Sequence, residues 1–240
     1  MRVLVTGATG FVGRAVVRRL LLAGHQPVAL VHQRTAPFPG SVPVIIGSVL
    51  DQDVLDEAAA RVDAVCHLAA TTRGRESLAD PLRYFRVNVD GTLNVLEALA
   101  KADTPAPRIV FTSTCLVYGE PAHQPISEAV VPQPTSPYGQ AKLAAEWAVA
   151  AHARTGAAGA TIIRTFNAAG AVGGSPTPTR PASSRGPSRW PPAGRMSCSS
   201  TAMARWSAST YTSMTWPPRS LPRLMRVPLA SAAPTTSAAG

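Results

Sequence analysis

The last quarter of this 240-residue chain contains no acidic residue. Residues 175–240 hold eight arginines and no lysine, aspartate or glutamate, whereas residues 1–174 hold 15 basic and 13 acidic side chains. The formal net charge of +10 therefore comes from the C-terminal segment alone. That segment carries no nucleic-acid motif and no interleaved aromatic platform, so the charge does not indicate a nucleic-acid partner.

Cysteine is scarce, and long apolar runs are missing. The three cysteines, Cys66, Cys115 and Cys198, show no metal-binding or redox spacing, so reduced thiols in a cytoplasm are expected. The apolar run at residues 16–23 is short and follows a glycine loop, which argues against a signal peptide or membrane span. We therefore expect a cytoplasmic protein without a metal, membrane or nucleic-acid partner.

A glycine-rich loop stands near the N-terminus. Gly7, Gly10 and Gly13 follow a short apolar run at residues 2–6 and precede a helical pattern at residues 11–22. A strand, a glycine loop and a helix N-terminus form the setting in which backbone N–H groups hold a pyrophosphate. The Gly-x-x-Gly-x-x-Gly spacing is a variant of the dinucleotide-binding fingerprint.

The first 170 residues alternate between strand and helix patterns. Strands are predicted at residues 2–6, 28–31, 42–46, 64–68, 109–112 and 160–163, and helices at 11–22, 52–60, 79–100 and 138–153. This order predicts an α/β fold with a doubly wound parallel sheet of the Rossmann kind, whose site lies at the carboxyl ends of the strands.

Tyr138 and Lys142 are the strongest candidates for chemistry. Their spacing of four places them on one face of a helix, where an ammonium near a phenol favours the phenolate. A tyrosine whose pKa falls from about 10 becomes a usable general base near neutral pH. Together with a bound dinucleotide, such a pair indicates redox chemistry on an alcohol or a ketone.

Six motifs in order resemble the extended short-chain dehydrogenase/reductases, in particular the NAD-dependent epimerase/dehydratase group. They lie at residues 7–13, 67–70, 88–92, 113–119, 136–142 and 164–170, and the resemblance covers residues 1–174. It implies a sugar-nucleotide substrate and, through the long helices on either side of the fifth strand, a possible homodimer.

The resemblance also implies roles for single residues. Tyr138 would be the catalytic acid/base, Lys142 would hold the nicotinamide ribose and lower the pKa of Tyr138, and Thr114 would hydrogen-bond the reacting hydroxyl. The implied cofactor contacts are Gly7, Gly10, Phe11, Val12, Gly13, Arg34, Val49, Ala69, Asn88 and Lys142. The implied substrate contacts are Thr114, Tyr138 and Asn167.

The two residues after Thr114 narrow the type of reaction. Members of the family that act as 4,6-dehydratases carry Asp-Glu there, whereas this chain has Cys115 and Leu116, so elimination is not expected. Residues 164–171 resemble the hexose 4-epimerases most, although those have Tyr where Thr165 stands. A ketoreductase acting on a keto-sugar or another carbonyl is the alternative.

The choice between NAD and NADP stays open in the sequence. A NAD enzyme of this fold usually ends its second strand with an acid for the ribose hydroxyls, whereas here Val31 stands, followed by His32, Gln33 and Arg34. A guanidinium at Arg34 could pair with a 2′-phosphate. Either cofactor therefore suits the sequence.

The segment at 175–240 is interpreted as out-of-frame translation. Joining the third base of each codon to the first two of the next turns Met203-Ala204 into Gly and Met214-Thr215 into Asp. Over residues 206–217 the same shift permits Val-Arg-Glu-Tyr-Leu-His-Val-Asp-Asp-Leu-Ala, which resembles the family's substrate-lobe sequence. We expect domain 1–174 to be a dinucleotide-binding domain and 175–240 to be a poorly ordered tail without that lobe. As written, the chain would then be either an enzyme or a non-catalytic, dinucleotide-binding remnant.

Overall fold

Six parallel strands form the central sheet of the chain, in the order β3-β2-β1-β4-β5-β6. A computed structural model describes residues 1–32, 38–40, 42–60, 62–105, 107–168, 171–172 and 175–176. The strands are β1 (Arg2–Thr6), β2 (Gln26–Val31), β3 (Val44–Ile46), β4 (Ala64–His67), β5 (Arg108–Thr114) and β6 (Gly159–Thr165). Reversal of the strand order at β1 and β4 gives the doubly wound topology that the sequence predicts.

The helices are α1 (Phe11–Leu22), α2 (Gln52–Ala59), α3 (Pro81–Phe85), α4 (Gly91–Lys101) and α5 (Pro137–Arg154). Short turns add η1 (Glu76–Leu78), a π-helical η2 (Arg86–Asp90) and η3 (Cys115–Tyr118). The helix predicted at residues 79–100 is thus interrupted by a π turn. Its period differs from 3.6 residues, which a hydrophobic pattern alone does not reveal.

Local sequence explains where these helices begin and end. The Asp51 side chain accepts a hydrogen bond from the Val54 N–H at the start of α2, and Ser136 caps α5 before a proline in its first turn. Helix α1 ends at Leu22, and Gly24 then adopts φ +74°, a conformation that favours glycine.

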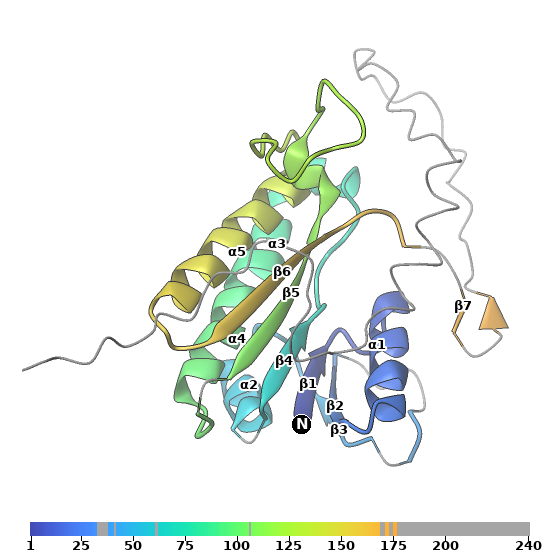
Figure 1. Cartoon of the computed structure of the whole chain (residues 1–240), viewed down its shortest axis with the longest axis vertical. Coiled ribbons are helices and arrows are strands. Elements are labelled where there is room, and N and C mark those ends of the chain that lie inside the picture. The colour runs from blue at the N-terminus through green and yellow to red at the C-terminus, as the bar shows by residue number, and fades with distance from the viewer. Residues whose placement is uncertain are drawn as a thin grey trace, which may run out of the picture.

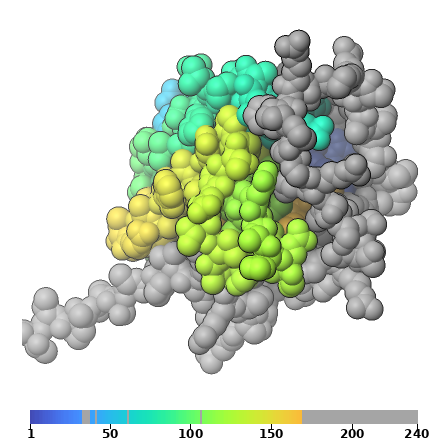
Figure 2. Space-filling view, turned by 90° about the horizontal axis from the view of Figure 1, so that it is seen from above, coloured from blue at the N-terminus to red at the C-terminus, as the bar shows by residue number. Residues whose placement is uncertain are grey.

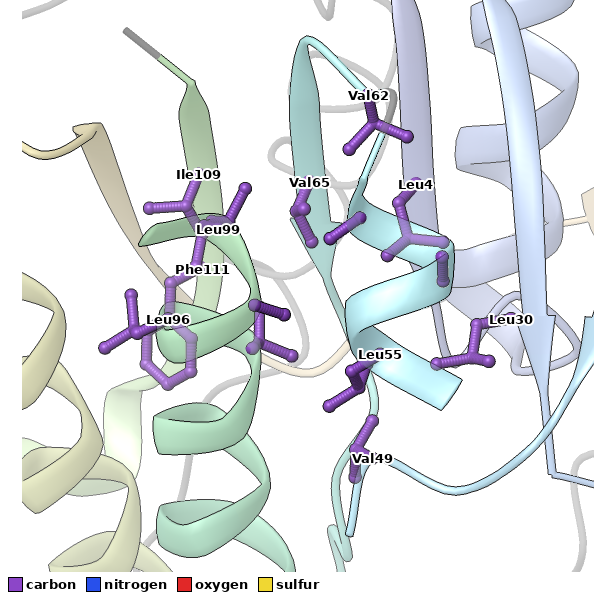
Figure 3. Packing of buried hydrophobic residues seen from close by; sticks show 14 of the residues in the cluster. Leu4, Leu30, Val49, Leu55, Val62, Val65, Leu96, Leu99, Ile109 and Phe111 are labelled. Atoms are coloured by element: carbon purple, nitrogen blue, oxygen red, sulfur yellow. The ribbon is translucent and has the colours of Figure 1, made fainter. Parts of the chain in front are cut away.

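Two apolar clusters cover the two faces of the sheet. On one face, α2, α4 and α5 bury Leu55, Leu96 and Val149 against strand residues such as Val65 and Phe111 (Figures 1 and 3). The other cluster packs α1 against β1, β2 and β4. Because both faces are covered, the strands are continuously apolar, as expected for a parallel sheet.

A short antiparallel pair, β7 (Ala171–Val172) and β8 (Ser175–Pro176), follows the sheet. The predicted domain boundary after residue 174 falls within this pair. The remainder of the predicted tail, residues 177–240, lies outside the described residues, and so does Arg34.

His67, at the end of β4, links three parts of the fold. Its Nδ1 lies 2.8 Å from the Thr6 hydroxyl of β1, and its Nε2 lies 3.1 Å from the Thr92 hydroxyl of α4. Thr92 in turn donates to the Asn88 carbonyl at 2.6 Å, and the imidazole stacks on Phe111 with ring centroids 5.8 Å apart. The strand end is therefore fixed from both sides.

These partners determine the histidine tautomer. The single hydrogen of the Thr92 hydroxyl is used on the Asn88 carbonyl, so Thr92 accepts from Nε2–H of His67. The Thr6 oxygen already accepts two backbone N–H groups just beyond β4, both at 3.1 Å, so its own hydrogen goes to Nδ1. The network thus holds His67 neutral, as expected for a hydrogen-bonded residue at a strand end.

The pH dependence of stability should report this neutral histidine. Burial lowers the pKa of His67 to about 3, and the Lys142 ammonium lowers it further in the same direction. Between pH 6.5 and 3 the unfolded chain therefore binds a proton that the folded chain does not, so stability falls as pH falls, by up to about 1.4 kcal/mol per pH unit.

Denaturant unfolding at pH 7.5, 6.5 and 5.0 measures this slope. We expect His67→Gln to be less stable than wild type at pH 7.5 but to lose less stability on acidification. The matched control, His123→Gln, changes an exposed histidine and should keep the wild-type slope. Equal slopes for wild type and His67→Gln would contradict the assignment.

Candidate functional site

The glycine loop between β1 and α1 is too tight for side chains. A Cβ on Gly13 would lie 2.2 Å from the Gly7 carbonyl oxygen, and one on Gly7 would lie 2.8 Å from the Ala69 nitrogen. Gly7 also has φ +66°, and the Gly10 N–H donates to the Gly7 carbonyl at 2.9 Å. The N-cap of α1 has no side-chain hydrogen bond, which leaves first-turn N–H groups to an anionic ligand. These features fit a dinucleotide pyrophosphate.

The other predicted cofactor residues lie around this loop or behind it. Phe11 and Val12 are half-buried in the first turn of α1. Asn88 is buried, and its amide is engaged by Thr71: Oδ1 accepts from the Thr71 N–H at 2.9 Å and Nδ2 donates to the Thr71 carbonyl at 3.1 Å. Asn88 therefore holds the segment that continues from Ala69.

Val31 and Val49 have core roles in the structure. Val31 is buried at the end of β2 in the cluster under α1. Val49 is 8% exposed in the other cluster, where its Cγ2 would lie 2.8 Å from a Cβ on Gly91 (Figure 3). Its carbonyl accepts a hydrogen bond from Asn94 at 3.1 Å. The predicted cofactor contact of Val49 would thus come from a residue whose side chain packs the core.

Tyr138 lies in the first turn of α5, beside the end of β5. Its hydroxyl shares a hydrogen bond with Thr114, the last residue of β5. Thr114 also accepts a hydrogen bond from the Leu116 N–H at 3.2 Å, which fixes the hydroxyl at the start of η3. The predicted catalytic pair Thr114 and Tyr138 is therefore brought together.

The position of α5 is set by close contacts around Tyr138. Its backbone N–H donates to the buried Ser77 hydroxyl at 3.2 Å, and its ring makes an edge contact with Tyr84, with centroids 6.2 Å apart. A Cβ on Gly139 would lie 2.8 Å from the Leu116 carbonyl oxygen, so the glycine permits the helix to approach η3. Figure 2 shows that the yellow-green segments after β5 and at the start of α5 share one surface.

The pKa of Tyr138 differs from the sequence expectation. We expected Lys142 to lower it, but burial raises the pKa of Tyr138 above its ordinary value, and the hydrogen bond with Thr114 opposes that rise. Helical spacing placed the two residues on one helix, but spacing alone carries no information about desolvation. The tyrosine is therefore protonated at neutral pH in this structure, which suits a group that also returns a proton.

Lys142 is buried one turn further along α5. It is 2% exposed, and its Nζ lies 4.0 Å from the centroid of the Phe111 ring. Burial lowers the pKa of Lys142 to about 7, against an opposing effect of the Glu146 carboxylate. A buried lysine that changes charge near neutral pH is typical of a functional site.

Glu146 and Arg164 form a buried ion pair that the sequence did not identify as part of the site. The Arg164 guanidinium binds both carboxylate oxygens of Glu146, with Nη2 2.6 Å from Oε2. The spacing of four between Lys142 and Glu146 was a local signal for this carboxylate. No local pattern connects Arg164 on β6 to α5, because only the folded sheet brings them together.

Asn167 is exposed two residues beyond β6. The end of β6 is in register with the end of β5, with Thr165 opposite Thr114 and its hydroxyl donating to the Ser113 carbonyl at 3.0 Å. Asn167 thus lies at the same sheet edge as the catalytic candidates, where a ligand of this fold binds.

The part of the chain that the structure describes holds no group of three or more histidine, cysteine or acidic residues that could bind a metal ion. No helix within those residues is both long and apolar enough to cross a bilayer. Cys66 and Cys115 are free thiols, and burial raises the pKa of Cys66 to about 12.

Known proteins resemble this chain over its first 180 residues or so. It is 38% identical over 175 residues to a UDP-glucose 4-epimerase of Streptomyces lividans, covering 70% of this chain and 52% of that protein. A UDP-glucose 4-epimerase of Azospirillum brasilense is 37% identical over 175 residues, covering 71% and 50%. The chain thus spans about half the length of these curated relatives.

Solved structures give the same picture. A UDP-glucose 4-epimerase from Brucella ovis in complex with NAD is 35% identical, with a TM-score of 0.66, covering 71% of this chain and 53% of that one. The Thermotoga maritima enzyme with UDP-glucose is 29% identical, with a TM-score of 0.63, covering 68% and 55%. The model of the NAD dependent epimerase/dehydratase family matches residues 3–184, which extends ten residues past the predicted boundary. The chain belongs to the NAD-dependent epimerase/dehydratase family.

Proposed function

We propose that residues 1–174 are the catalytic and cofactor-binding part of a nucleotide-sugar 4-epimerase that acts through a 4-keto intermediate. The observation that carries this proposal is the hydrogen bond between Tyr138 and Thr114 at the end of β5, one helical turn from the buried Lys142. The relatives from Streptomyces lividans and Azospirillum brasilense are UDP-glucose 4-epimerases, which supports UDP-hexose as the substrate class.

In the proposed reaction, Tyr138 accepts the proton of the sugar C4 hydroxyl and later returns it. Thr114 donates a hydrogen bond that orients this oxygen, and the Lys142 ammonium stabilises the phenolate that forms. When bound, NAD accepts the C4 hydride and returns it to the opposite face of the keto sugar. The raised pKa of Tyr138 suits the return of the proton, because a phenol is a better donor than a phenolate.

The proposed cofactor is NAD. The glycine loop fits a pyrophosphate, and the structures from Brucella ovis and Thermus thermophilus hold NAD. The expectation of NADP rested on Arg34, which lies outside the described residues. The epimerase relatives likewise favour epimerisation over the ketoreductase alternative, in which the oxidised cofactor leaves after each cycle.

The C-terminal segment is proposed to be out of frame. A chain that spans half the length of its relatives and carries shifted codons over residues 203–217 lacks the in-frame substrate-lobe sequence. Substrate would then be held from one side only, and the positioning that makes C4 reactive would be lost. The chain as written is thus proposed to bind cofactor with little or no turnover, in a cytoplasm that keeps Cys66 and Cys115 reduced.

A second copy of the chain is the proposed partner. Helices α3, α4 and α5 lie together on one side of the sheet (Figure 1). Their exposed side chains include the apolar Leu82, Leu93 and Trp147, which are 74%, 40% and 66% exposed. An apolar face of this kind on paired helices favours a homodimer.

Replacing Tyr138 tests the chemistry, and it is done in a chain whose frame is restored after codon 174. Tyr138→Phe keeps the ring and loses the acid/base, so turnover should fall by about 10²–10⁴-fold. Titration should show nearly unchanged NAD affinity, with NAD binding more tightly than NADP. Tyr84→Phe, a neighbouring buried tyrosine, is the control and should stay near wild type. Near-wild-type turnover by Tyr138→Phe would refute the assignment.

Resequencing the DNA around codon 174 tests the reading frame. The proposal predicts that a change of one base restores the lobe sequence, and that the corrected chain epimerises UDP-glucose while the chain as written does not. A confirmed frame together with full activity of the chain as written would show that the interpretation is wrong.

Sedimentation velocity tests the dimer. Trp147→Glu places a charge on the exposed face of α5 and should convert a dimer into a monomer at micromolar concentration. Leu22→Glu, an equally exposed apolar position on α1, is the control and should leave the dimer intact. A wild-type chain that stays monomeric at 100-fold higher concentration would contradict the proposal.

A further inference from the structure

Two opposite charges are buried one turn apart on α5. Lys142 is 2% exposed and Glu146 is 3% exposed, and they are the only buried lysine and the only buried acid among the described residues. A spacing of four puts both on one helix face, where an acid and an amine ordinarily pair.

The Glu146 carboxylate is nevertheless bound elsewhere. Arg164 donates from Nε to both carboxylate oxygens, at 3.0 and 3.2 Å, and from Nη2 to Oε2 at 2.6 Å. Among the described residues no hydrogen bond joins Lys142 to Glu146, and the ammonium lies over the Phe111 ring instead. The carboxylate is therefore committed to the cation on β6.

Arg164 is itself held in place. It lies opposite Ser113 in the register of β5 and β6, and its guanidinium carbon lies 4.8 Å from the centroid of the Tyr118 ring. Contact with Glu146 and Tyr118 raises the pKa of Arg164 above its ordinary value, so it keeps its charge at every accessible pH. A buried ion pair contributes little net stability, because desolvation offsets the attraction.

We infer that Arg164 is a positioning residue for Lys142: by binding both oxygens of Glu146 it withholds that carboxylate and leaves the Lys142 ammonium free to donate to the cofactor ribose. This inference deepens the proposed function and rests on it for the identity of the ligand. The arrangement also keeps one excess positive charge at the site, where a phenolate forms during the reaction.

Few other groups can change the charge state of Lys142. Of the charged or titratable groups around it, Glu146 lies on its own helix, as does Tyr138, while β5 contributes only the uncharged Phe111 and β4 contributes His67, which the threonines keep neutral. Freeing Glu146 should therefore raise the pKa of Lys142 from about 7, and removing its charge should lower it.

The chain offers a direct readout, because Lys101 and Lys142 are its only lysines. Labelling lysine with ¹³C at Cε gives two NMR signals, which Lys101→Met assigns and which are followed against pH in the full chain. In Arg164→Met the Lys142 midpoint should rise by about one to three pH units, and in Glu146→Gln it should fall. The exposed Lys101, paired with Asp56, is the internal control and should not move.

The double variant identifies the route. If Arg164 acts through Glu146, then Arg164→Met/Glu146→Gln should show no upward shift and should match Glu146→Gln. Arg164→Lys, which keeps the charge but not the two-pronged grip, should give a smaller rise and covers the case in which Arg164→Met does not fold. An unchanged Lys142 midpoint in folded Arg164→Met or Arg164→Lys, or an upward shift that persists in the double variant, overturns the inference.

Titration with NAD separates this inference from the proposed function. Arg164→Met should weaken NAD binding about tenfold at pH 6, with recovery in the double variant. If the wild-type chain binds no NAD while the NMR midpoints move as expected, the proposed function fails and the control of Lys142 by Arg164 stands. If NAD binds equally well to wild type and Arg164→Met, the assigned purpose of the pair is wrong.

Discussion

The close approach of three chain segments at the carboxyl end of β1 is the constraint on which the rest of the site depends. Gly7 lies against the backbone at Ala69, and Gly13 lies against the Gly7 carbonyl, so no side chain fits between the loop, α1 and the segment after β4. The Thr6 hydroxyl ties the same two strands together through His67 and the backbone beyond it. This packing sets where a pyrophosphate can lie and how far it is from the end of β5.

The catalytic side chains are placed by a second set of contacts on the opposite side of β4. Helix α5 is held by Ser77 at its start and by the close approach of Gly139 to η3, which brings Tyr138 to Thr114. Its next turn buries Lys142 against Phe111, the residue on which His67 also stacks. Phe111 thus connects the cofactor half and the catalytic half, and the desolvation that it contributes to makes Lys142 titrate near neutral pH.

Much of this arrangement could be predicted from sequence because it rests on local signals. The glycine spacing, the alternation of apolar strands with amphipathic helices and the Tyr138–Lys142 interval each act within one or two elements, and the structure has all of them in the predicted order. The raised pKa of Tyr138 and the grip of Arg164 on Glu146 could not be predicted, because both depend on burial and on contacts between elements distant in the chain. The π turn at Arg86–Asp90 was missed because a hydrophobic period does not distinguish it from a regular helix.

The central claim, that this site moves a hydride off C4 and back onto the same carbon, can be measured with isotope. A frame-restored chain is incubated with UDP-glucose deuterated at C4, with NAD, in ordinary water. The account predicts UDP-galactose that retains the deuterium at C4, with no build-up of reduced cofactor, because the hydride returns within the same cycle. Loss of the deuterium from the product, or reduced cofactor accumulating with keto sugar, would contradict it.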